Sequence, residues 1–197
     1  MCGRYTVYSE HDIIEMREII EELNRKFGYE PSSTGEIRPT DLAPVLQLQG
    51  DVVTSAAIRW GFPHFSGSGV VINARAETAL DKPMFRRSLL DRRCVMPATG
   101  FFEWMDLGGR MKAKHLLNLP ESQILYLAGM TNHFDKTEGP HDAFVILTTA
   151  ANESVAPIHN RMPVILTADE IKPWLTDPGA MSHILTRPGP RLLVWPA

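Results

Sequence analysis

Short apolar runs separated by glycine-rich turns dominate this chain, and such runs are typical of β-strands. The turns include Gly50-Asp51, Gly67-Ser68-Gly69, Gly108-Gly109 and Gly139-Pro140. The runs predict strands over residues 45–49, 52–60, 70–74, 94–104, 124–130 and 144–149, with a last short strand over 192–195. Sheet is therefore expected to dominate the regular structure that follows the first helix.

Two segments have helical spacing instead. Apolar residues recur every three or four positions over 13–27, after a capping-box pattern at residues 9–12. Gly28 is a natural end for that helix, because glycine readily adopts the left-handed conformation of a helix C-terminus. A second capping box, which begins at Thr167, predicts a helix that runs to about residue 175.

These elements predict an α+β fold, a single domain over residues 1–197 built on a curved, mostly antiparallel sheet or barrel with a few flanking helices. Apolar residues make up 44% and charged residues 22%, which is ordinary for a soluble protein. No stretch approaches the roughly 18 apolar residues of a membrane span, and the first residues resemble neither a signal nor a transit peptide. We expect a cytoplasmic monomer without membrane contact.

Cysteine and histidine usage argues against a metal or another cofactor. The two cysteines, Cys2 and Cys94, form no disulfide framework, which fits a reducing cytosol. The seven histidines are scattered without metal-ligand spacing. We therefore expect no metal and no cofactor.

The net charge of −3 excludes wholesale wrapping of nucleic acid but allows a local basic groove. Four arginines cluster over residues 86–93. That cluster is interpreted equally well as a solvated helical face or as a DNA contact.

The second residue carries the most distinctive chemistry. Methionine aminopeptidases remove Met1 when the next side chain is small, and Cys2 would then hold a free α-amine beside its thiol. The pKa values of such groups are about 8 and about 8.5, so both have a nucleophilic fraction at neutral pH. A 1,2-aminothiol of this kind can attack an acyl carbon through sulfur, or condense with an aldehyde and close to a thiazolidine.

Two polar islands in the middle of the chain are candidates for a site. If residues 72–78 are extended, Asn73, Arg75 and Glu77 share one face, where they could hold an amine and a phosphate; Arg75 and Glu77 could equally form a surface ion pair. Glu103 follows Phe101 and Phe102 and precedes Trp104 at the end of an apolar strand. Burial there would suit Glu103 to proton transfer, whereas an exposed strand edge is the alternative.

Two further islands follow. Residues 144–152 form an apolar run that ends in a polar loop and includes Thr148. In the segment 158–164, His159 and Arg161 would point the same way if extended. A lone histidine is more often structural than catalytic, but a nucleophile, a carboxylate, an amide and two arginines in one small domain favour a catalytic site.

Four segments together resemble the SOS response-associated peptidase (SRAP) family, whose members process abasic sites in single-stranded DNA. They occur in the family's order, and the resemblance runs from Cys2 to about Leu166. The segments are Met-Cys-Gly-Arg-Tyr at 1–5, Ile-Asn-Ala-Arg-Ala-Glu-Thr-Ala at 72–79, Cys-Val-Met-Pro-Ala-Thr-Gly-Phe-Phe-Glu-Trp at 94–104, and Ile-His-Asn-Arg-Met-Pro at 158–163.

The resemblance implies a role for each matching residue. Cys2 would crosslink to the aldehyde of the ring-opened deoxyribose, Asn73 would position the α-amine and the sugar, Glu103 would transfer protons, and His159 would assist at the Schiff-base and elimination stages. The resemblance further implies that the DNA path is formed by Arg4, Arg75, Trp104, Thr148 and Arg161. It also implies a nucleoid association when DNA is bound, and allows self-cleavage ahead of Cys2 and abasic-site lyase activity.

Two segments depart from the family's pattern. Residues 37–41 replace an Asn-x-Ala-Pro-like stretch, and the loop 61–71 lacks the tryptophans that often wedge DNA, with Phe65 as a possible substitute. Three alternatives stay open. Class II glutamine amidotransferases also begin Met-Cys-Gly but usually continue with isoleucine, where this chain has Arg4. The others are a non-catalytic binder of modified DNA and a peptidase limited to the residues ahead of Cys2.

Overall fold

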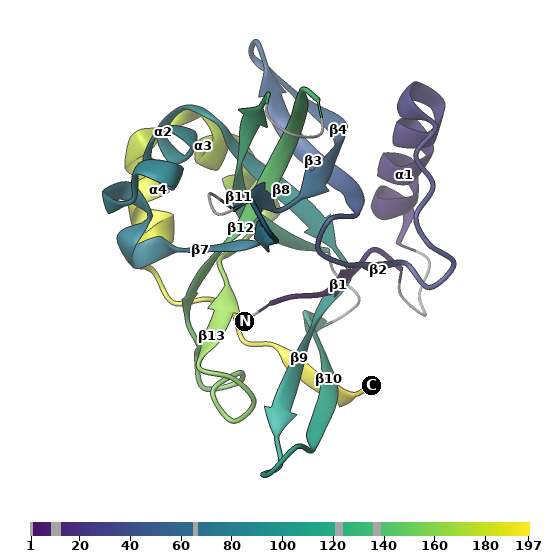
Figure 1. Ribbon diagram of the computed structural model, residues 1–197, viewed down its shortest axis with the longest axis vertical. Helices are drawn as coiled ribbons and strands as arrows, with labels where there is room; N and C mark the ends of the chain where they lie inside the picture. Colours follow the sequence, from purple (N-terminus) through teal and green to yellow (C-terminus); the bar gives the residue numbers. More distant parts are fainter. Residues whose placement is uncertain (1, 9–12, 65–66, 121–123, 136–138) are drawn as a thin grey trace.

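A closed ring of five strands forms the centre of the computed structural model, which describes residues 2–8, 13–64, 67–120, 124–135 and 139–197 (Figure 1). Four of the five contacts around the ring are antiparallel, and the ring closes where β12 and β4 run parallel, with Phe144 beside Trp60. In order around the ring the strands are β4 (Val52–Trp60), β3 (Leu42–Gln49), β8 (Arg93–Ala98), β11 (Leu125–Phe134) and β12 (His141–Ala150).

Short strands extend this barrel at its rim. β7 (Asn73–Arg75) lies parallel to β12, and β13 (Arg161–Pro163) lies antiparallel to β12. β14 (Ile165–Leu166) pairs antiparallel with β11. β5 (Phe62–Pro63) and β6 (Val70–Val71) form a separate two-stranded antiparallel ribbon. Strands β7 and β13 therefore bring segments far apart in sequence to one end of β12.

A second sheet holds the start of the chain. Its strand order places β1 between β9 and β2, and Phe102 N–H donates to the carbonyl of Arg4, which continues the β1–β9 pairing toward the N-terminus. The strands in order are β15 (Leu193–Pro196), β10 (Lys112–Asn118), β9 (Gly100–Asp106), β1 (Tyr5–Thr6) and β2 (Glu36–Ile37).

Aromatic packing anchors this sheet to the barrel. The buried ring of Tyr5 lies 5.3 Å from Trp60, which stacks on Phe144 at 6.1 Å. The indole N–H of Trp60 donates to the carbonyl of Ile72 at 3.0 Å. The buried ring of Tyr5 therefore packs the N-terminal segment against the barrel.

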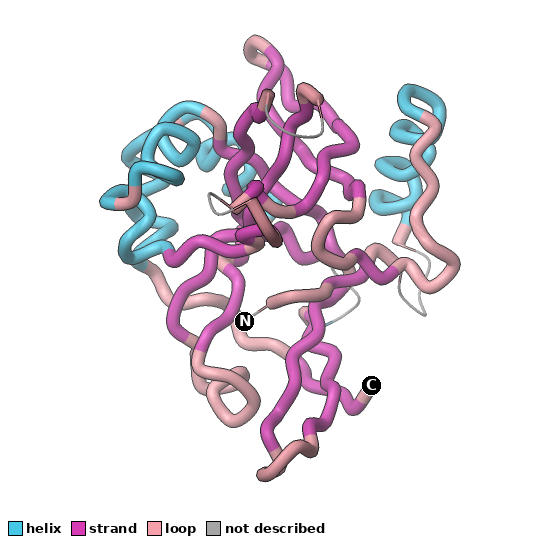
Figure 2. The backbone as a smooth tube through the Cα atoms, in the orientation of Figure 1, coloured by secondary structure: helices cyan, strands magenta, loops and turns pink. Residues whose placement is uncertain are grey.

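The helices lie on two sides of the barrel (Figure 2). α1 (Ile14–Phe27) flanks β3 and β4, and the other helices gather on the opposite side: η1 (Ala76–Asp81), α2 (Pro83–Asp91), η3 (Ala168–Glu170), α3 (Ile171–Thr176) and α4 (Pro178–Thr186). The buried guanidinium of Arg93 ties α2 to α3, because it donates to the carbonyls of Leu89, Leu90, Trp174 and Leu175. In the part of the chain that the structure describes, no helix is long and apolar enough to cross a membrane.

The predicted fold class is confirmed, and so are the helix that ends at Gly28 (φ 64°) and the capping box of Thr167 with Glu170. The capping-box pattern at 9–12 lies outside the described residues. Arg86, Arg87 and Arg92 belong to α2 or its C-terminal cap, where Arg87 forms a surface ion pair with Asp91 at 3.8 Å; Arg93, by contrast, is buried.

Two predicted strands are each divided. The run 94–104 changes sheets at Thr99, whose backbone and hydroxyl donate to the carbonyl of Thr6. The run 70–74 changes partners at Ile72, so Val70–Val71 pairs with β5 and Asn73–Arg75 pairs with β12. Strand β10 and helix α4 were not predicted, because β10 contains no β-branched or aromatic residue and α4 begins with Pro178-Gly179, a pair typical of turns.

Candidate active site

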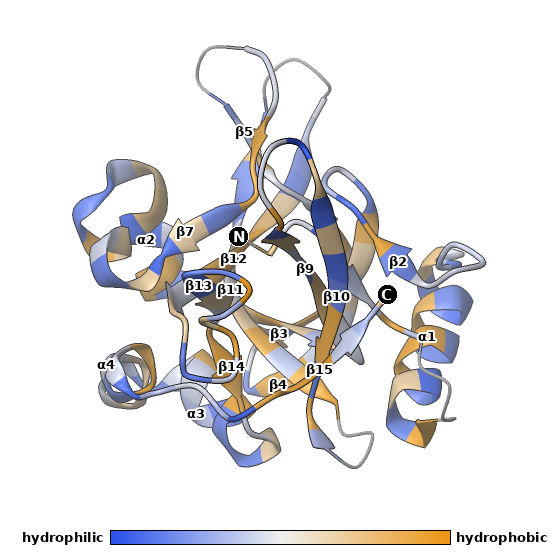
Figure 3. Ribbon diagram, turned by 90° about the horizontal axis from the view of Figure 1, so that it is seen from below, coloured by the Kyte–Doolittle hydropathy of each residue, from blue (hydrophilic) through white to orange (hydrophobic). Residues whose placement is uncertain are grey.

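The N-terminal segment ends between β9 on one side and β7 and β13 on the other, and two perpendicular views agree on this placement (Figures 1 and 3). Cys2 is fully buried, and its thiol donates weakly to the carbonyl of Arg4 at 3.9 Å. Burial, and next the negative charge of Glu103, raise the pKa of the Cys2 thiol well above its usual range. The thiol is therefore held protonated in this environment.

Glu103 approaches Cys2 from β9. The β1–β9 register carries Cys2 along the part of β9 that contains Glu103, which agrees with the effect of that carboxylate on the thiol pKa. Only 2% of Glu103 is exposed, and its strand neighbours Phe101 and Phe102 are buried as well. The interpretation of Glu103 as an exposed strand-edge residue is therefore wrong.

Asn73 holds the backbone of Cys2 from β7. Its amide Nδ2 donates to the Cys2 carbonyl at 2.9 Å. Its Oδ1 is buried and accepts no hydrogen bond from any residue that the structure describes. Because the Asn73 amide already faces Cys2, this oxygen is well placed to accept from a further donor at the N-terminus.

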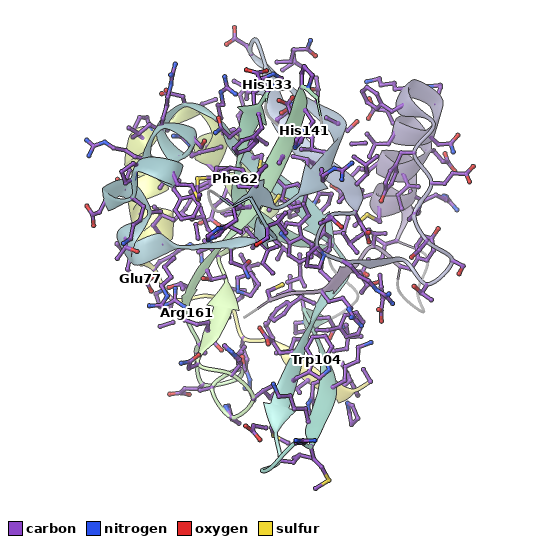
Figure 4. All side chains as sticks on the ribbon, viewed as in Figure 1. Phe62, Glu77, Trp104, His133, His141 and Arg161 are labelled. Carbon is purple, nitrogen blue, oxygen red and sulfur yellow. The ribbon has the colours of Figure 1, made fainter. Side chains whose placement is uncertain are left out.

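Arg75 and Glu77 do not share a strand face, because the extended segment ends at Arg75 and Glu77 lies in η1. Glu77 instead forms a bidentate ion pair with Arg161, with Nη1–Oε1 and Nη2–Oε2 distances of 2.6 and 2.8 Å (Figure 4). This hydrogen bonding holds the pKa of the Glu77 carboxyl below its usual range. Arg75 is left exposed on the same edge.

Arg161 also binds Thr148. Its Nη2 donates to the Thr148 carbonyl at 2.6 Å, and the Thr148 hydroxyl bonds to the carbonyl of Ala74 at 3.4 Å. The Thr148 side chain is fully buried. Direct contact of Thr148 with a ligand strand stays a prediction that would need this packing to open, whereas its support of Arg161 is explicit in the geometry.

The loop that carries His159 fixes the imidazole. The backbone N–H of Arg161 donates to His159 Nδ1 at 2.9 Å, so the neutral ring carries its proton on Nε2. The loop begins at Asn152, whose Nδ2 donates to the carbonyls of Gly189 and Pro190 at 3.1 and 2.7 Å. His159 is thus held in one tautomer by a loop fastened to the C-terminal segment.

Replacing Asn152 with alanine is expected to lower the free energy of unfolding by about 2 kcal/mol, because it removes both amide bonds and the acceptor for the Ser154 hydroxyl. The measurement is equilibrium denaturation in urea. Asn160→Ala is the matched control: Asn160 is exposed in the same loop, and its loss is expected to change stability by less than about 0.5 kcal/mol. Equal losses for the two variants would contradict the assigned role of Asn152.

Arg4 and Trp104 form a separate half-buried pair near Cys2. The guanidinium of Arg4 lies 5.2 Å from the centre of the Trp104 ring, and its Nη1 donates to Glu36 at 3.3 Å. Glu36 also binds Lys114 from β10 at 2.6 Å. Sequence reasoning missed Glu36 and Lys114, because each is an ordinary charged residue in its own strand. Only the strand order of the sheet brings the two residues close to Arg4.

The structure therefore brings Asn73 into contact with the Cys2 backbone, and it places Glu103 near enough for its negative charge to raise the pKa of the Cys2 thiol. His159 lies in the loop that leads into β13, and Arg161 at the start of β13 binds the carbonyl of Thr148 on β12. Within the described ranges, no group of three or more histidine, cysteine or acidic side chains could hold a metal ion. The site thus combines a thiol, a carboxylate and an amide, with the half-buried Arg4 guanidinium nearby.

Comparisons with known proteins agree over nearly the whole chain. A family model described as SOS response associated peptidase (SRAP) matches residues 1–195. The abasic site processing protein YoqW of Bacillus subtilis is 35% identical over 94% of this chain and 86% of its own length. The abasic site processing protein YedK of Escherichia coli is 25% identical over 89% of this chain and 79% of its own length. A crystal structure from Bacteroides thetaiotaomicron shares the fold, with a TM-score of 0.81 at 22% identity over 99% of this chain and 91% of that one.

Proposed function

Because the chain belongs to the SRAP family, we propose that it processes abasic sites in single-stranded DNA through a covalent crosslink at Cys2. Removal of Met1 frees the α-amine of Cys2. The amine attacks the aldehyde of the ring-opened sugar, and loss of one water gives an imine. The thiol then adds across the C=N bond: the S–C bond forms, the thiol proton passes to nitrogen, and a thiazolidine ring closes.

Each neighbour of Cys2 has a role in this sequence. Asn73 fixes the Cys2 carbonyl with Nδ2, and its Oδ1 would accept a hydrogen bond from the freed α-amine, which orients the nitrogen lone pair. Glu103 would donate a proton to the leaving water and take one from the thiol, whose raised pKa makes a nearby base necessary. His159, with its proton on Nε2, would donate to the sugar or phosphate oxygen during Schiff-base and elimination steps.

The half-buried Arg4 and the exposed Arg75 support a DNA path past these groups. Arg4 and Arg75 would bind flanking phosphates, and the half-exposed Trp104 would stack on an unpaired base, which favours a single strand over a duplex. Arg161 would bind phosphate only with its pairing to Glu77 rearranged, and Thr148 would act through Arg161. Self-cleavage ahead of Cys2 and abasic-site lyase activity are further steps that the same nucleophile, carboxylate and imidazole would support.

The observation that carries the proposal is the burial of Cys2 with its carbonyl bound by the Asn73 amide, near enough to the buried Glu103 carboxylate for that charge to raise the thiol pKa. A binder of modified DNA without catalysis would not need a thiol, an amide and a carboxylate at one point. Fixed orientation of two reacting groups contributes several kcal/mol to a two-centre reaction, on the order of 7 kcal/mol in favourable cases.

A denaturing gel tests the proposal. Protein lacking Met1 is incubated with single-stranded DNA that carries one abasic site, without reductant. We expect a slower band that survives denaturation, and no such band with undamaged DNA of the same sequence. Absence of the band with confirmed loss of Met1 would overturn the proposal. A glutaminase activity in place of the band would favour the amidotransferase alternative.

A further inference from the structure

Three cations from three different segments converge on one carboxylate beside the start of β1. Lys114 binds Glu36 Oε1 at 2.6 Å, while Arg4 and Arg38 approach Glu36 Oε2 at 3.3 and 3.6 Å. Hydrogen bonding to Lys114 and the neighbouring positive charges hold the pKa of the Glu36 carboxyl below its usual range, so Glu36 is ionised at neutral pH. The cluster of Arg4, Arg38, Lys114 and Glu36, here called the Glu36 cluster, therefore has two positive charges in excess.

The carboxylate is the least exposed side chain of the Glu36 cluster, and the three cations are more exposed. The side chain of Glu36 is 16% exposed, those of Lys114 and Arg4 are 25% and 30% exposed, and that of Arg38 is 60% exposed. The carboxylate thus lies beneath the cations and holds them from the protein side. Each cation has more N–H donors than its bond to Glu36 uses, and the outer donors face solvent.

Two aromatic rings also contact the cations of the Glu36 cluster. The Lys114 ammonium lies 3.9 Å from the centre of the Phe102 ring, and the Arg4 guanidinium lies 5.2 Å from that of Trp104. Phe102 and Trp104 belong to β9 and flank Glu103. Two cations of the Glu36 cluster therefore pack against side chains of β9, the strand that also carries Glu103.

The geometry points to the Glu36 cluster as a binding site for backbone phosphates of the DNA strand, with Lys114 and Arg38 as contacts beyond Arg4. This inference rests on the proposed function for the identity of the strand. The two oxygens of Glu36 separate Lys114 from the two guanidinium groups, and this spacing presents ammonium and guanidinium donors to the oxygens of one phosphate or of two consecutive ones. The site would hold the strand on the β9–β10 side of Cys2, opposite the edge that carries Arg75.

Salt dependence of binding tests this assignment. Binding of a fluorescein-labelled oligothymidylate without abasic sites is followed by anisotropy at increasing NaCl concentration. For single strands each lost phosphate contact reduces the slope of log K against log salt by about 0.7. We expect that reduction for Lys114→Ala, about twice as much for Lys114→Ala with Arg38→Ala, and a nearly unchanged slope for Lys114→Arg, which keeps the charge.

Lys172→Ala is the matched control, because Lys172 is exposed in α3 and distant from β10. Its slope is expected to equal that of the parent protein, and thermal unfolding confirms that each variant is folded. An unchanged slope for Lys114→Ala and for the double variant would overturn the inference and leave the Glu36 cluster as an ion-pair network that joins β2 to β10. The crosslink assay separates the two proposals: failure of the parent protein to crosslink refutes the proposed function, whereas a reduced slope in Lys114→Ala supports the phosphate site in either case.

Discussion

Cys2→Ala protein is expected to form no denaturation-resistant complex with abasic single-stranded DNA, even when it retains full non-covalent binding. The reason is that the thiazolidine cannot close without the thiol, and an imine at the α-amine hydrolyses during denaturation. Cys2→Ser is expected to give only a transient imine, because a hydroxyl is the weaker nucleophile and an oxazolidine is the more labile ring. The measurement is a denaturing gel with and without borohydride, which reduces an imine to a stable amine.

The control for this experiment concerns folding, because Cys2 is fully buried. Removing its sulfur is expected to cost about 1 kcal/mol of stability, so unfolding curves must show that the variant is native under the assay conditions. Cys94→Ala is the matched variant: Cys94 is equally buried in β8 and should crosslink like the parent. If Cys2→Ala forms as much stable complex as the parent, another residue is the nucleophile.

Blocking the α-amine is expected to abolish crosslinking as completely as removal of the thiol. A retained Met1 or an N-terminal tag converts the Cys2 nitrogen into an amide, which cannot form an imine. Non-covalent binding should remain nearly intact, since the side chains of Arg4 and Arg75 are unchanged. The measurement is parallel gel and anisotropy assays on the blocked protein.

A C-terminal tag, with mass spectrometry confirming loss of Met1, should restore the covalent band. Equal crosslinking by a protein whose leader is still attached would exclude the α-amine and favour a mechanism through the thiol alone. Loss of the leader during the incubation would support self-cleavage ahead of Cys2, and Glu103→Gln and His159→Ala would then identify the group responsible.

Local signals predicted much of the fold. The helix that ends at Gly28 and the capping box at Thr167 depend on contacts within a few residues, and both were predicted. The divisions at Thr99 and Ile72 were not, because each strand changes partners there while its apolar run continues unbroken. A change of partner depends on segments far away in sequence, which periodicity does not report.

The same limit applies to the candidate site: contacts between segments far apart in the sequence were not predicted. The aromatic neighbours of Glu103 made burial one of two interpretations, and the structure decided between them. The pairing of Glu77 with Arg161 rather than Arg75 did not, since it requires β7 and β13 to lie on the same end of β12. Likewise Glu36 and Lys114 reach Arg4 only when β1 lies between β2 and β9 with β10 beyond.

Peptide mapping of the crosslinked protein tests the central claim most directly. The DNA in the covalent complex is digested to the attached sugar fragment, the protein is cleaved with trypsin, and the modified peptide is sequenced by mass spectrometry. Trypsin cleavage after Arg4 would release the peptide Cys2-Gly3-Arg4. We predict that this peptide carries the sugar, with both the α-nitrogen and the sulfur of Cys2 blocked to alkylation. Recovery of the sugar on a lysine, with Cys2-Gly3-Arg4 unmodified, would contradict the account.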